Sequence, residues 1–133
     1  MKEAMSGDDP WAAYDQIAWA ERGALTPEHL RLLAVGSLRT ELNNGGFDQY
    51  FFNSAGDLVP IALAAAEEAG ATELASLICE ALNLLNATDP TNRTARQKAL
   101  QRLEPEGFQL LDEAYLALEA STDLDGVMRS LMS

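Results

Sequence analysis

Apolar residues recur along most of the chain at the three- and four-residue intervals of an amphipathic helix. In the clearest example, the segment 72–85, one helical face carries Leu74, Leu77, Ile78, Ala81, Leu82 and Leu85. No stretch alternates apolar and polar residues as a half-buried strand does, and no β-branched run has the length of a strand. The sequence therefore predicts an all-α fold, a compact bundle of about six to eight helices.

Capping residues and glycines mark where the first helices should begin and end. Asp9-Pro10 and Thr26-Pro27 each combine an N-cap residue with proline at the first helical position. We expect the helix after Thr26 to end at residues 43–46, where two glycines favour a helix C-terminus. A short aromatic segment over 47–52 should then form one or two further helical turns.

Similar signals divide the second half of the chain. Asp57 and Thr72 are expected to cap the helices over 58–69 and 72–85. Further helices are expected over residues 92–103, from residue 105 and from residue 123. The 133 residues fit one domain, and no linker or repeat divides them. We predict a flexible N-terminus over residues 1–8 and a single helical domain over residues 9–133.

The chain carries no pattern typical of a membrane or secreted protein. Residues 1–9 lack an apolar stretch, so we expect no signal peptide, and no apolar run approaches the length of a membrane span. The single Cys79 excludes an internal disulfide and indicates a reducing cytoplasm. Because Cys79 lies within an apolar helical segment, we expect it to be a small buried side chain.

Charge is the most unusual property of the composition. Twenty-one Asp and Glu residues face nine Lys and Arg residues, which gives a net charge of −12. Residues 40–92 and 103–128 contain no Lys, Arg or His, and a basic segment separates them with Arg93, Arg96, Lys98 and Arg102. Direct binding to nucleic acid or to an anionic membrane is disfavoured, because phosphate contact needs clustered basic residues. The predicted partner is a basic protein.

Two interpretations of this charge pattern remain open. The acidic faces could only solvate the helices, with the basic segment paired to an acidic neighbour. Alternatively, rows of carboxylates could stand in for phosphates before a basic groove, because long-range steering depends on charge. For the second interpretation the candidate partner-binding residues are Glu67, Glu68, Glu73, Glu80, Asp112, Glu113 and Glu119.

The segment 41–57, ELNNGGFDQYFFNSAGD, has the composition of a tight corner. Its Asn and Gly residues permit positive φ and let two helices approach closely. Its aromatic side chains supply a large apolar surface that must be buried or bound. Glu41 is expected to accept hydrogen bonds from free backbone N–H groups there. The segment is thus either a packing corner or a pocket lined by Glu41, Asn44, Gln49 and Tyr50.

This segment closely resembles the signature of a bacterial DNA-mimic protein family, a family of domains of unknown function with the pattern E-x-N-N-G-G-F-x-Q-Y/F-F-x-N. The resemblance is specific over residues 41–57 and extends loosely over about 9–130 through helix order and length. It implies a helical domain, often dimeric, whose best-understood members present an acidic surface that occupies the DNA site of a DNA-binding protein. It also implies a structural role for the signature residues Glu41, Asn43, Asn44, Gly45, Gly46, Phe47, Gln49, Tyr50, Phe51, Asn53, Gly56 and Asp57. The basic segment departs from a uniformly negative surface.

No catalytic constellation can be assembled from these residues. One His and one Cys leave no triad, no zinc site and no recognised metal or cofactor motif. We therefore predict a protein-binding module, with no catalytic residue, metal or cofactor, that acts as a DNA mimic. The alternatives are an immunity-type or structural dimeric protein, or a small ligand-binding domain or enzyme that uses the 41–57 corner.

Overall fold

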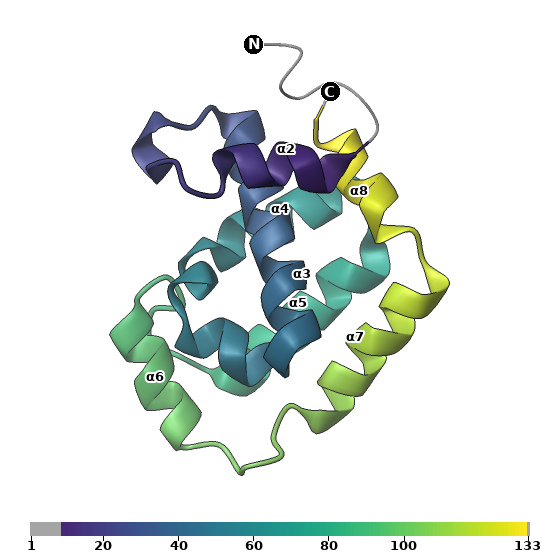
Figure 1. Cartoon of the computed structure of the whole chain (residues 1–133). Helices are drawn as coiled ribbons and strands as arrows, with labels where there is room; N and C mark the ends of the chain where they lie inside the picture. Colours follow the sequence, from purple (N-terminus) through teal and green to yellow (C-terminus); the bar gives the residue numbers. More distant parts are fainter. Residues whose placement is uncertain (1–8, 133) are drawn as a thin grey trace.

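The computed structural model describes residues 9–132, which form a helical bundle without a strand in that range (Figure 1). Its α-helices are α2 (Pro10–Ile17), α3 (Pro27–Phe52), α4 (Val59–Glu68), α5 (Thr72–Leu85), α6 (Arg93–Gln101), α7 (Gln109–Ser121) and α8 (Leu124–Ser130). Two short 3-10 helices, η1 (Arg22–Ala24) and η2 (Ser54–Leu58), connect them. The prediction of an all-α bundle is confirmed. The predicted flexible segment over 1–8 lies outside the described residues.

Helix α3 runs through the middle of the bundle and contacts α2, α4, α6, α7 and α8 (Figure 1). Its buried side chains include Leu32, Val35, Leu38 and Leu42, which occur at helical spacing. A helix surrounded by neighbours buries most of its surface, whereas the outer helices keep one polar face. Near one end of the bundle α2 packs beside α8, although the two are far apart in sequence.

The helix end expected at residues 43–46 falls at Gly46, where a kink interrupts α3, and the helical turns expected over 47–52 form the second part of α3. Gly46 has φ 77° and ψ −169°, a conformation that a residue with a side chain rarely adopts. The helix resumes beyond it because the backbone N–H of Phe47 donates to Asp112 Oδ1 at 2.9 Å. A carboxylate of α7 thus acts as an N-cap in the middle of α3.

Helices α2 and α3 begin where the sequence predicts, because the residue that caps each helix directly precedes it in the chain. The side chain of Asp9 accepts from the N–H groups of Trp11 and Ala12, and Thr26 Oγ1 accepts from the N–H of His29. The predicted caps at Asp57 and Thr72 are wrong, since neither side chain accepts such a bond. Asp57 lies within η2 and pairs with arginines, and Thr72 is already the first residue of α5.

The position of Cys79 differs from the sequence prediction. Cys79 is exposed, so the prediction of a buried thiol is wrong: the buried face of α5 includes Leu74, Ile78 and Leu85 but not Cys79. Among residues 9–132, no helix is both long and apolar enough to cross a membrane.

Candidate functional site

Glu41 organises the polar side chains of the 41–57 corner. Its Oε1 atom accepts from Gln49 Nε2 at 2.8 Å and from Asn53 Nδ2 at 3.0 Å. Asn44 Nδ2 in turn donates to Gln49 Oε1 at 3.3 Å. Side-chain amides, rather than the expected backbone N–H groups, therefore satisfy Glu41. These hydrogen bonds link Glu41, which precedes the kink in α3, to Gln49 after the kink and to Asn53, the residue that follows the helix.

Close packing accounts for the glycines at the kink. A Cβ atom on Gly45 would lie 2.2 Å from Gln49 Oε1, and one on Gly46 would lie 2.5 Å from Asp112 Oδ2. Either atom would displace a side chain that holds the corner together. Asp112 is therefore half-buried against the kink, unlike the exposed acid that a partner-binding role would require.

Arg96 is fully buried beneath the end of the corner, with 0% of its side chain exposed. Its guanidinium donates to three backbone carbonyls, those of Phe51 (2.8 Å), Pro90 (2.9 Å) and Asn53 (2.9 Å). It also lies 2.8 Å from the carboxylate of Asp57. The sequence places Arg96 in a basic surface segment, but the structure removes it from the surface. Its spacing to Ala99 and Leu103 was the available signal of burial.

Gly56 permits this approach, because a Cβ atom there would lie 2.8 Å from Arg96 Nε. The rings of Phe47 and Phe51 stack on each other, and both pack at a tilt against Phe108 inside the bundle. Tyr50 is also buried, and burial raises the pKa of its hydroxyl. These contacts are all internal to the fold.

The pocket interpretation requires Glu41, Asn44 and Tyr50 to line one cleft. A cleft of about 480 Å³ does lie between α2 and α3, with Trp19, Arg22 and Glu41 along its wall. Asn44 is exposed outside it and Tyr50 is enclosed in the core. The three side chains do not converge, and Trp19, which is 95% exposed, marks the rim instead.

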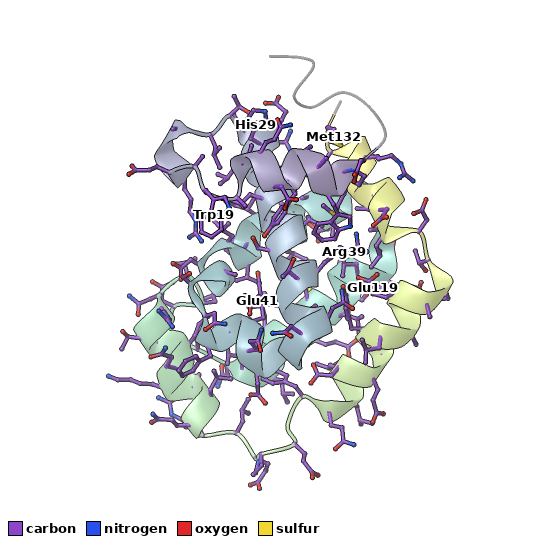
Figure 2. The ribbon with its side chains drawn as sticks, viewed as in Figure 1. Trp19, His29, Arg39, Glu41, Glu119 and Met132 are labelled. Carbon is purple, nitrogen blue, oxygen red and sulfur yellow. The ribbon has the colours of Figure 1, made fainter. Side chains whose placement is uncertain are left out.

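A second polar cluster joins α3 to α7 and α8 (Figure 2). Arg39 donates from Nε and Nη2 to both carboxylate oxygens of Glu119, at 2.9 and 2.8 Å, and from Nη1 to Asp125 at 2.8 Å. Asn43 Nδ2 donates to Glu119 at 3.1 Å, and the Tyr115 hydroxyl donates to the same carboxylate. We call Arg39, Asn43, Tyr115, Glu119 and Asp125 the Arg39 cluster.

The Arg39 cluster also ties in α2. Trp11 Nε1 donates to Asp125 at 3.1 Å, and the Arg39 guanidinium lies 5.1 Å from the centre of the Trp11 ring. Arg39 is 6% exposed and Glu119 is half-buried, whereas Asn43 and Asp125 reach the surface. Glu119 therefore differs from the expectation that it faces a partner, because its carboxylate is committed to holding Arg39.

Burial and hydrogen bonding shift the titration of these groups in opposite directions. Burial raises the pKa of Glu119, but hydrogen bonds from Arg39, Tyr115 and Asn43 outweigh it and lower the pKa below its ordinary value of 4.5. The hydrogen bond from Arg39 likewise lowers the pKa of Asp125. Burial raises the pKa of Asp48. Burial also raises the pKa of Asp112, and the nearby charge of Asp48 adds to this effect. The hydrogen bond from the Phe47 N–H lowers the pKa of Asp112 but does not reverse the upward shift.

We expect the stability of the protein to fall in acid through the Arg39 cluster. A carboxyl whose pKa is lower in the folded state stabilises fully above its unfolded pKa, and this contribution disappears as pH falls through the folded pKa. For Glu119 the loss begins near its ordinary value of 4.5. Urea unfolding followed by circular dichroism, from neutral pH to about pH 3, measures it.

The Glu119→Gln variant is the matched test of this pH dependence. It lacks the titrating carboxyl, so its free energy of unfolding should decline less between neutral and acid pH than that of the parent. Asp48 and Asp112 work in the opposite sense, because a raised pKa favours folding when the group is protonated. An acid profile that is identical in parent and variant would contradict the assignment to Glu119.

The remaining predicted acids lie on the surface. Glu67 and Glu68 end α4, Glu73 and Glu80 lie on α5, and Glu113 lies on α7; all five are exposed. Helices α4, α5 and α7 contain no Lys, Arg or His. The carboxylates on these three helices therefore have no basic residue on their own helix with which to pair.

Basic side chains are instead mostly engaged inside the fold or by nearby acids. Besides Arg39 and Arg96, ion pairs join Arg22 to Asp57, Arg31 to Glu68 and Arg129 to Asp123. Arg93 donates to the carbonyl of Phe52. Within residues 9–132, the exposed Lys98 and Arg102 take part in none of the ion pairs. Among the described residues, Glu67, Glu73, Glu80 and Glu113 therefore form none of the ion pairs, whereas Glu68 is paired with Arg31.

Comparison with known proteins adds one match. A family model described as DMP19-like protein matches residues 23–131. Searches of curated proteins and of solved structures gave no match. The matched range runs from η1 to the end of α8 and contains the 41–57 corner, the Arg39 cluster and the exposed acids.

Proposed function

Because the chain belongs to the DMP19-like protein family, we propose that it is an acidic protein-binding module that occupies the nucleic-acid site of a basic DNA-binding protein. The observation that supports this most is the exposed carboxylates on α4, α5 and α7, three helices without a basic residue. The 41–57 corner serves this function indirectly, since its kink is packed against Asp112 of α7. The single, exposed Cys79 favours action in the reducing cytoplasm.

The mechanism is competition for cations. Carboxylates on a rigid helix can engage the Lys and Arg side chains that otherwise hold phosphates. Glu73 and Glu80 are seven residues apart on α5, so their backbone positions differ by about 10 Å along the helix axis. Arrays of this kind attract a basic surface at long range, and the attraction weakens with salt.

We expect binding to a basic partner to depend steeply on salt and on three of these acids. The triple variant Glu73→Lys, Glu80→Lys and Glu113→Lys should lose at least about 100-fold in affinity, because three close charge pairs become repulsive. A pull-down from lysate of the source cell at low salt, eluted in salt steps, identifies the partner. Duplex DNA added to the bound complex should release it, because both ligands would share one site.

The matched control reverses three exposed acids on α2, before η1 and in the first turn of α3: Asp15→Lys, Glu21→Lys and Glu28→Lys. It changes net charge by the same amount but leaves α5 and α7 intact. Equal losses in both triple variants would show that net charge alone matters. Binding that is indifferent to salt and to DNA would overturn the proposal.

A further inference from the structure

A groove of about 400 Å³ separates α5 from α7 on the surface. Most of the side chains that line it are small or apolar: the lining includes Glu73, Ser76, Leu77, Ala114, Ala117 and Leu118. The N-terminal turn of α5 lies beside the end of α7, since Gly70–Leu74 line an adjoining depression with Leu118 and Thr122. The two helices therefore run antiparallel and form opposite walls of one groove.

Large apolar side chains extend each wall beyond the groove. On α7, Leu110, Ala114, Ala117 and Ser121 follow one another at spacings of four, three and four residues, so they share one face. On α5, the same spacing relates Glu73, Leu77, Glu80 and Leu84. Leu110 is 80% exposed and Leu84 40% exposed, an arrangement that leaves apolar surface in water.

The charges beside the groove are all of one sign. Glu73 lines it, Glu80 continues the same row, and the exposed Glu113 lies next to Ala114. Neither α5 nor α7 contains a Lys, Arg or His. A second copy of the chain would bring the same acids, and a net charge of −12, against this face. Like charges disfavour that occupant, whereas a cationic one is complementary.

We propose that the α5–α7 groove receives an amphipathic helix of a basic partner. A row of apolar side chains on that helix packs over Leu77, Ala114 and Ala117, and flanking Lys and Arg side chains meet Glu73, Glu80 and Glu113. Small residues on a helix surface allow a third helix to approach to about 8–10 Å between axes. Helix-in-groove recognition of this kind reads apolar anchors at helical spacing.

This inference rests on the proposed acidic binding function and adds an apolar contact to it. Charge alone gives attraction that salt removes, whereas burial of apolar side chains survives salt. The groove therefore distinguishes basic helices with an apolar face from other cationic surfaces. A purely electrostatic mimic would not make this distinction.

The test uses two fluorescent helical peptides of about 18 residues, five turns, with the same Lys content. One carries a row of Leu at helical spacing and the other carries Gln at those positions. Fluorescence anisotropy with the full chain should show that the Leu peptide binds at least about tenfold more tightly, and that it alone retains binding in high salt.

Groove filling provides the matched variants. Ala117→Gln places a longer side chain in the groove without changing charge and should weaken the Leu peptide by about tenfold while leaving the Gln peptide unaffected. Ala120→Gln makes the same change on the outer face of α7 and should alter neither. Both alanines are exposed, so folding is preserved.

Each remaining outcome decides between the two proposals. Equal, salt-sensitive binding of both peptides would overturn the groove and leave the acidic surface standing. Equal effects of Ala117→Gln and Ala120→Gln would also overturn the groove. Failure of both peptides to bind at low salt would count against both proposals. A homodimer in sedimentation that Ala117→Gln dissociates would assign the groove to a second copy instead.

Discussion

Replacing Arg96 with methionine is expected to lower the free energy of unfolding by about 3–5 kcal/mol. The guanidinium holds the carbonyls of Phe51, Asn53 and Pro90 and pairs with Asp57. Methionine fills a similar volume but donates no hydrogen bond, so three carbonyls and a carboxylate lose a partner at once. Urea unfolding followed by circular dichroism measures the change.

Two further variants show which property of Arg96 stabilises the fold. One tests the loss of any basic residue from α6, and the other keeps the charge at position 96 but removes the guanidinium hydrogen bonds. Lys98→Met removes an exposed cation from the same helix and should change stability by less than about 0.5 kcal/mol. Arg96→Lys keeps the charge, but a lysine ammonium cannot reproduce the fixed fork of guanidinium donors, so it should recover little of the loss. Equal stability of Arg96→Met and the parent would contradict the assigned role.

Arg39→Met should lower the free energy of unfolding by about 3 kcal/mol, because it leaves Glu119 without its cation in a mostly buried site. Glu119→Gln should cost less, because Arg39 keeps its bond to Asp125. The loss in the double variant should fall short of the sum of the two single losses by at least about 1 kcal/mol. A double-mutant cycle by urea unfolding gives this coupling energy directly.

Glu113→Gln is the matched control for the Arg39 cluster. It neutralises an exposed acid of the same helix α7 and should change stability by less than about 0.5 kcal/mol. The comparison also separates two roles for acids of α7. Glu119→Gln should alter stability, and Glu113→Gln should alter partner binding. Additive effects of Arg39→Met and Glu119→Gln would show that the two side chains are not coupled.

Local features of the fold were predictable from sequence where their cause is local. Asp9 and Thr26 cap helices because each side chain reaches an N–H group two or three residues ahead. The 47–52 segment is helical and largely buried because its aromatic side chains follow helical spacing. The sequence predicted the break at residues 43–46 and the helical turns after it, but not the cap on those turns, because that cap comes from Asp112 on another helix.

For the candidate site, the sequence established the excess of acids and their segregation from bases along the chain. It could not show that Arg39 and Arg96 are buried, although each lies in register with apolar neighbours at helical spacing. It also placed Glu119 and Asp112 among the partner-facing acids. In the structure Glu119 binds an arginine 80 positions away, and Asp112 caps a residue 65 positions away.

The sequence by itself determined the helices, most of their ends, the net charge and the composition of the 41–57 corner, because hydrogen bonds and periodicity within a few residues control these properties. Only the tertiary structure decided which charges reach the surface and that a groove forms between α5 and α7. An ionised side chain has no preferred partner at a set spacing along the chain. Its pairing depends on which helices pack together and on the water that this packing excludes.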